Sequence, residues 1–178
     1  VGKKLHMNVK VIVTDGSQPI GNGIGPLLEA EDVMAVLRND PLAPADLKEK
    51  SLKLAGMMLE MAGSRRGRKR AEELLGNGKA LAKMNQIIKA QGAQRKPTLG
   101  QWRFQVTSRA SGKIVEIDNL VIAKLARIAG APQDKGAGLY LNKHVSDRIL
   151  KGEVLYTIYA ESEFKLEETK ALLHKNNG

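Results

Sequence analysis

The spacing of apolar residues divides the chain into a helical front part and a mixed back part. The β-branched run 8–14 predicts a strand, and a glycine-rich loop follows it. Apolar positions then recur with helical periodicity, which predicts helices over 28–37, 45–62, 68–75 and 79–90. Helix 45–62 is apolar around most of its circumference, so we expect it to be buried.

The predicted strand 8–14 needs neighbours. A single strand leaves two unpaired edges, and nothing else in residues 1–97 has the pattern of a strand. The chain also begins at Val1, without an initiator methionine. We expect that the sheet starts upstream of Val1 and that this missing N-terminal part of the protein is a partner of the chain.

The back part alternates short strands and helices, which is typical of a small α+β domain. Its first two strands form a predicted hairpin, and Asp118 or Asn119 caps the helix that follows. Residues 146–158 have the rhythm of a barrel-sandwich strand pair. In order, the predicted elements are the strands 102–107 and 113–117, the helix 119–129, the strands 138–141 and 153–159, and the helix 166–174.

Composition changes near residue 97. All six aromatic residues follow this point and all six methionines precede it, and the junction 94–100 contains helix breakers. We therefore place one domain at 1–97 and a second at 98–178. The predicted fold class is α/β (α+β): the end of a mixed α/β sheet domain with covering helices, followed by a small, hammerhead-like C-terminal domain.

Charge and composition narrow the classes of function. The net charge is +10, but residues 1–100 carry 17 basic and 10 acidic residues and residues 101–178 carry 12 and 9, so the excess is diluted. The absence of cysteine excludes disulfides and thiolate chemistry. No apolar run reaches the roughly 20 residues that cross a bilayer. These features fit a cytoplasmic protein.

The basic run 65–70 places five cationic side chains in six residues. Such a run is able to contact the phosphates of a nucleic acid. It has no interleaved aromatic residues for base stacking, however, and Glu72 and Glu73 follow at helical spacing. We favour a solvated, salt-bridged helix start, with a basic nucleic-acid-binding module as the alternative.

The glycine loop, residues 20–25, lies between a predicted strand and a helix, where phosphate loops occur. Pro26 stands where the dinucleotide pattern needs glycine, and no Gly-Lys-Ser/Thr of a P-loop is present. The carboxylates of Glu29, Glu31 and Asp32 at the helix start would repel a phosphate. A cation held by loop carbonyls and one carboxylate is the functional alternative to a purely structural loop.

No catalytic or cofactor-binding residue can be assigned from spacing. The histidines His6, His144 and His174 do not have metal-ligand spacing, and we expect each of them at the surface. No Ser-His-Asp triad can be proposed either.

Two stretches resemble the thymidine phosphorylase family. Residues 14–30 contain an aspartate, two further residues and the string Gln-Pro-Ile-Gly at 18–21, similar to the family's Asp-x-x-Gln-Pro-Leu-Gly. Residues 112–138 resemble the family's C-terminal domain. Because Gly25 and Pro26 stand where bacterial pyrimidine nucleoside phosphorylases have Gly-Asn, the sequence resembles the archaeal AMP phosphorylase branch more closely.

The resemblance implies phosphorolysis, in which phosphate is the co-substrate and displaces the base from C1 of a ribose. For an AMP phosphorylase the products are adenine and ribose 1,5-bisphosphate; the alternative is a thymidine or pyrimidine nucleoside phosphorylase. The family's catalytic motifs do not occur in this chain. The resemblance therefore implies an inactive C-terminal third of a homo-oligomeric enzyme that acts on a small nucleotide or nucleoside.

A monovalent cation site is implied by the same resemblance. In this sequence its matching positions are the backbone carbonyls of Ile20 and Gly23 and the carboxylate of Asp32. The family usually has Glu at the last position, so Asp32 supplies a shorter arm.

Overall fold

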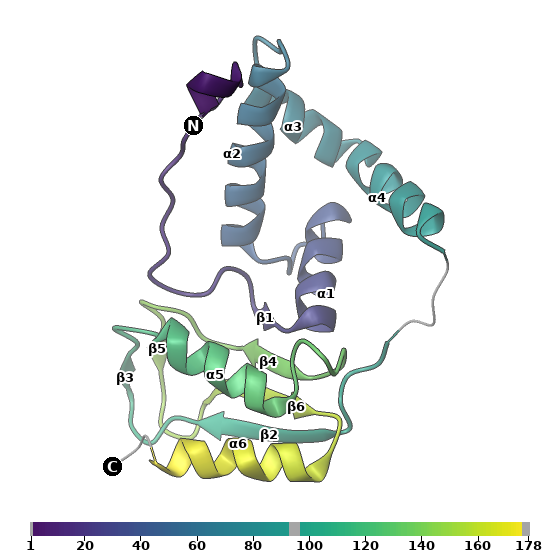
Figure 1. Cartoon of the computed structure of the whole chain (residues 1–178). Coiled ribbons are helices and arrows are strands. Elements are labelled where there is room, and N and C mark those ends of the chain that lie inside the picture. The colour runs from purple at the N-terminus through teal and green to yellow at the C-terminus, as the bar shows by residue number, and fades with distance from the viewer. Residues whose placement is uncertain (1, 93–96, 176–178) are drawn as a thin grey trace.

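The computed structural model describes residues 2–92 and 97–175, and it confirms the predicted α+β class. The front helices lie together on one side of the sheet-containing back part (Figure 1). The front elements are the 3-10 helix Gly2–Leu5, β1 (Gly23–Ile24), α1 (Pro26–Leu37), α2 (Ala45–Met61), α3 (Gly67–Gly76) and α4 (Lys79–Ala90). The back elements are β2 (Trp102–Thr107), β3 (Gly112–Lys113), α5 (Asn119–Ala129), β4 (Gly138–Leu141), β5 (Arg148–Ile149), β6 (Val154–Ala160) and α6 (Glu163–Lys175).

A four-stranded antiparallel sheet organises the back part. Its strand order is β1-β4-β6-β2, so β6 lies between β4 and β2. Along β2, half-buried Trp102, Phe104 and Val106 alternate with exposed residues, as expected for a strand with one face on the core. A separate pair, β3 with β5, forms a second small sheet.

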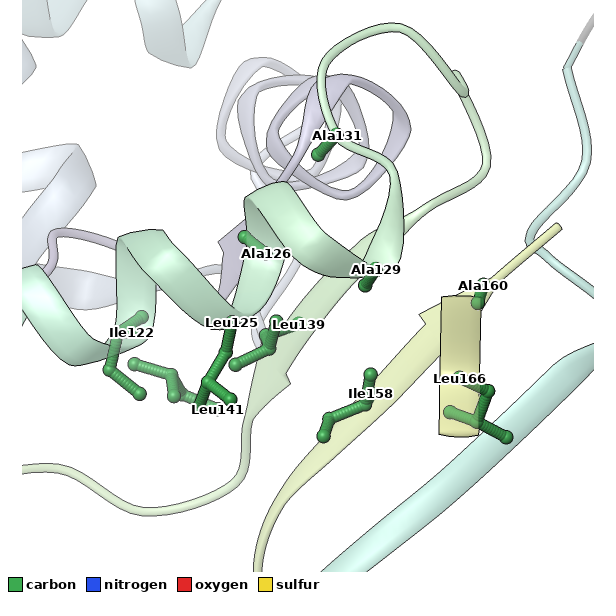
Figure 2. Packing of buried hydrophobic residues seen from close by; sticks show 10 residues of the cluster. All are labelled: Ile122, Leu125, Ala126, Ala129, Ala131, Leu139, Leu141, Ile158, Ala160 and Leu166. Carbon is green, nitrogen blue, oxygen red and sulfur yellow. The ribbon is translucent and has the colours of Figure 1, made fainter. Parts of the chain in front are cut away.

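The main core lies between this sheet and two helices. Helix α5 packs on β4 and β6, α6 packs on β6 and β2, and the two helices contact each other, so they cover the same face. Leu125, Leu139 and Ile158 are fully buried where these elements meet (Figure 2). Figure 2 labels the ten buried residues of this cluster: Ile122, Leu125, Ala126, Ala129, Ala131, Leu139, Leu141, Ile158, Ala160 and Leu166.

Helix α5 begins and ends where its sequence indicates. Asp118 is the N-cap, and its carboxylate accepts hydrogen bonds from the backbone N–H groups of Leu120 and Val121. Gly130 follows the helix with φ 124°, a conformation that favours glycine. The prediction of this helix and of its cap is therefore confirmed.

A smaller core joins α2 and α3 in the front part. The two helices approach closely at Gly56, where an added Cβ would lie 2.8 Å from the Cα of Arg68. Glycine is therefore needed for this contact. The buried apolar residues of this second cluster are Val36, Leu52, Ala71 and Leu75.

The predicted hairpin between 102–107 and 113–117 is wrong. Strand β2 pairs instead with β6, from Trp102 opposite Ala160 to Thr107 opposite Val154. From the second predicted strand, Lys113 alone is in a strand, and β3 pairs with β5. Strand β2 pairs with β6 because this pairing buries its apolar face in the core. The residues next to β2 in the sequence do not specify that partner.

The predicted strand 8–14 is also wrong for this chain. The segment is irregular, and Val9, Val11 and Val13 are 58%, 84% and 88% exposed. No strand of the described residues pairs with this segment, so its backbone forms no interstrand hydrogen bonds.

Helix α2 is not buried all round, contrary to the prediction. Leu52 and Gly56 are its buried residues, whereas Met58 is 71% exposed. The described part of the chain supplies too little structure to cover its apolar circumference.

The domain division at residue 97 stays a prediction, and part of the junction 94–100 lies outside the described residues. Within the described ranges, no helix is long and apolar enough to cross a membrane.

Candidate functional site

The glycine loop runs from Ile20 to Gly25 and leads into α1, whose first residue is Pro26. Gly21 and Gly25 have φ values of 74° and 126°, which side chains rarely tolerate. At Gly23, an added Cβ would lie 2.6 Å from the backbone oxygen of Leu28. The loop therefore requires these glycines to curl back against the first turns of α1.

Carboxylates accept hydrogen bonds from the backbone N–H groups of this loop. Asp32 is 7% exposed, and its Oδ2 accepts hydrogen bonds from Asn22 N and Gly23 N, both at 2.7 Å. Asp46 Oδ2 accepts from Gly21 N at 3.0 Å, and Glu29 Oε1 accepts from Gly25 N at 2.9 Å. Because these N–H groups already face anionic side chains, they are not available to a phosphate.

Two of the three predicted cation ligands, Gly23 and Asp32, are in contact, but the described residues do not form a complete cage. Asp32 contacts the backbone N–H groups of the loop and not its carbonyl oxygens. All its hydrogen bonds fall on Oδ2 in the described part of the chain, which leaves Oδ1 for a further ligand. No group of three or more acidic or histidine side chains suited to a metal ion occurs among those residues. The cation at Ile20, Gly23 and Asp32 stays a prediction.

The opposite side of the loop is built into the sheet of the back part. Gly23 and Ile24 form β1 and pair with Tyr140 and Leu139 of β4. Leu141 N donates to Asn22 O at 2.7 Å, which extends this pairing by one more hydrogen bond. The loop is therefore fixed between α1 and β4, two elements far apart in the sequence.

Residues beyond β4 add contacts that the sequence did not indicate. His144 Nε2 lies 2.9 Å from the side-chain Oδ1 of Asn22, and Val145 N donates to Gln18 Oε1 at 2.8 Å. His144 is half-buried, so it is less exposed than a fully solvated surface residue. His6 is exposed as predicted, and the side chain of His174 lies outside the described residues. No local pattern could have found a contact that spans 122 residues.

Two of the five cationic side chains in the basic run at the start of α3, those of Arg68 and Arg70, form salt bridges. Arg68 makes two hydrogen bonds of 2.8 Å to the carboxylate of Glu49 and one of 2.7 Å to Glu72. This guanidinium holds the pKa of Glu49 below its ordinary value, and the two carboxylates raise the pKa of Arg68 further. Arg70 pairs with Glu73 at 3.1 Å. The geometry favours the solvated helix start over a nucleic-acid site.

A groove of about 800 Å³ lies in the back part, between β2, the segment before α5, and the start of β6. Phe104, Ile117 and Leu141 contribute to its apolar lining, and Arg109 and Lys113 also line it. Burial raises the pKa of Tyr156 in this groove. The lining does not include any residue of the glycine loop.

Replacement of Asp32 by alanine should destabilise the chain, because two loop N–H groups would lose their charged acceptor. We expect a loss of about 3 kcal/mol in the free energy of unfolding. Urea denaturation measures this loss, with Glu31→Ala as the control, since Glu31 is the exposed neighbour on α1. Equal stabilities of the two variants would contradict the assigned role of Asp32.

Comparison with known proteins identifies the back part directly. Residues 113–178 match the family model described as the pyrimidine nucleoside phosphorylase C-terminal domain. Three curated relatives carry the name "Putative thymidine phosphorylase". The chain is 46% identical to the one from Albidiferax ferrireducens, with 100% of the chain and 35% of the relative covered.

The other two relatives are similarly related. For Nitrobacter hamburgensis the identity is 55%, over 90% of the chain and 32% of the relative. For Rhodopseudomonas palustris it is 50%, over 100% of the chain and 36% of the relative. The chain spans about a third of the length of these curated relatives. The comparisons therefore support the thymidine and pyrimidine nucleoside phosphorylase family for this chain, and its residues 113–178 match that family's C-terminal domain.

Proposed function

We propose that the chain is part of a phosphorylase that cleaves an N-glycosidic bond with inorganic phosphate. The observation that carries this proposal is the 46% identity to a thymidine phosphorylase-named relative along the whole chain. In the reaction, a phosphate oxygen bonds to C1 of the ribose while the bond from C1 to the base nitrogen breaks. The departing base takes up a proton, so a general acid assists it.

AMP is the first candidate substrate, with adenine and ribose 1,5-bisphosphate as products. Its support is the resemblance at Gly25 and Pro26 to the AMP phosphorylase branch. In the structure, Gly25 adopts a φ of 126° and Pro26 is the first residue of α1, so this dipeptide sets the exit of the glycine loop. Thymidine is the second candidate, favoured by the names of the relatives.

The phosphate cradle of this enzyme is proposed to lie in polypeptide that the chain does not span. The loop N–H groups of Gly21, Asn22, Gly23 and Gly25 are bonded to carboxylates, which repel phosphate. The chain covers 35% of a relative, and its last 66 residues match a domain described as C-terminal. The remaining length of the relatives therefore offers room for the phosphate and base sites on the N-terminal side.

An exposed apolar surface of the front part supports this arrangement. The segment around Val9, Val11 and Val13 lies beside α2, since Lys10 Nζ is 3.4 Å from Glu60 Oε2 and Lys50 Nζ donates to Asp15 O at 2.9 Å. On α2, Leu54, Met58 and Met61 are 38%, 71% and 40% exposed. Their i, i+4 and i+7 spacing places them on one face of the helix. Soluble proteins rarely leave such surfaces uncovered, so we propose that the rest of the polypeptide covers it.

Substitution of Val11 by aspartate tests this cover. In the 178-residue chain Val11 is 84% exposed, so the free energy of unfolding should change by at most about 0.5 kcal/mol. In a polypeptide of the relatives' full length the buried charge should cost about 3 kcal/mol. Denaturant titration of both lengths measures the difference. An equally small change in the free energy of unfolding of both proteins would contradict the proposal that the rest of the polypeptide covers Val11.

A monovalent cation beside the glycine loop is proposed as part of the same site. Asp32 Oδ1 and the carbonyls of Ile20 and Gly23 are its candidate ligands, because hard cations prefer oxygen. Thermal unfolding of the full-length protein should then show a higher midpoint in potassium chloride than in tetramethylammonium chloride at equal ionic strength. The difference should vanish in Asp32→Ala. Equal unfolding midpoints of the unsubstituted protein in both salts would contradict the proposed cation site.

Phosphorolysis itself is tested by chromatography of the released base. The full-length protein should release adenine from AMP, or thymine from thymidine, in a reaction that depends on inorganic phosphate. The 178-residue chain should show no turnover with AMP, uridine or thymidine. Preference for AMP over thymidine supports the first candidate substrate, and the reverse supports the second. Turnover by the short chain, or none by the full-length protein, would refute the proposal.

A further inference from the structure

Asn22 uses all of its polar atoms to join the glycine loop to three different parts of the fold. Its backbone N donates to Asp32 of α1 at 2.7 Å, and its backbone O accepts from Leu141 of β4 at 2.7 Å. Its side-chain Nδ2 donates to the Tyr140 hydroxyl at 3.3 Å, and its Oδ1 lies 2.9 Å from His144 Nε2. These four bonds restrict both the backbone and the side chain of Asn22.

The chemistry of the Asn22–His144 contact fixes which atom carries the proton. An amide oxygen is an acceptor, so the ring nitrogen opposite it must be an N–H donor. The amide nitrogen of Asn22 donates to the Tyr140 hydroxyl, which is able to accept this bond. With the amide oxygen of Asn22 toward the ring, the imidazole of His144 donates through Nε2–H in this contact.

The loop that carries His144 is itself held in place. His144 N donates to Asp147 Oδ2 at 2.8 Å, and Asp147 N donates to His144 O at 3.1 Å. The next residue, Val145, donates its backbone N–H to Gln18 Oε1 at 2.8 Å. These bonds hold the backbone from which the imidazole projects, so His144 can orient the side chain of Asn22.

We infer that His144 is a positioning residue, which fixes the side chain of Asn22 through Nε2–H and thereby locks the glycine loop onto β4. The lock is made between residues 122 positions apart. Any effect of this contact on catalysis rests on the proposed function, whereas its effect on the loop structure does not. The prediction is that loss of this one donor loosens the backbone around Asn22 and Gly23.

Three replacements of His144 separate hydrogen bonding from packing. In His144→Gln the amide nitrogen stands as many bonds from the backbone as Nε2, so it can donate to Asn22 Oδ1. In His144→Asn the amide nitrogen stands where Nδ1 was and falls short. His144→Ala removes the donor altogether. Lys143→Ala is the matched control, because Lys143 pairs with Glu153 and not with the glycine loop.

Amide hydrogen exchange of the full-length protein is the main readout. Exchange at Asn22 and Gly23 should accelerate about tenfold in His144→Ala and His144→Asn, the effect of one lost hydrogen bond. It should return to the original rate in His144→Gln and stay unchanged in Lys143→Ala. The nitrogen NMR shifts of His144 should also show the Nε2–H tautomer. If the protein performs phosphorolysis, its kcat/KM should follow the same order across the variants.

The outcomes separate this inference from the proposed function. The expected exchange pattern in a protein without phosphorolysis supports the lock and rejects the enzyme assignment. Unchanged exchange in His144→Ala overturns the lock, whatever the activity. Equal rescue by His144→Asn and His144→Gln also overturns it, since packing rather than a donor at Nε2 would then explain the effect.

Discussion

The hydrogen bonds between the glycine loop and its carboxylates are the interaction on which the rest of the site depends. Backbone N–H groups of a curled loop form a concave donor site that would otherwise attract an anion. In this chain the anion is supplied internally, chiefly by Asp32, with Asp46 and Glu29 beside it. The loop is thereby ordered by α1 and α2, and its N–H side is closed to phosphate.

This closure explains how a glycine-rich loop between an irregular segment and a helix can be ordered without binding phosphate. Its second edge is paired with β4, so the loop connects the front helices to the back sheet. Gly23 lies at the centre of this junction, bonded to Asp32 on one side and paired with Tyr140 on the other.

Local patterns predicted much of this structure, and non-local pairing accounts for the rest. The helices, the Asp118 cap and the unsuitability of the loop for phosphate follow from spacing and charge within a few residues. The pairing of β2 with β6 and the contact of His144 with Asn22 join distant residues, and no nearby pattern specifies them. The run 8–14 has the composition of a strand but lacks a neighbour in the described residues, so its propensity alone could not form one.

The central claim is that the N–H groups of residues 21–25 belong to the protein's own carboxylates. An experimental structure of the full-length protein with bound phosphate or sulfate would test it most directly. The account predicts that Asp32 Oδ2 keeps its hydrogen bonds to Asn22 and Gly23 and that the anion binds elsewhere. An anion seated on these N–H groups, with Asp32 turned away, would contradict it.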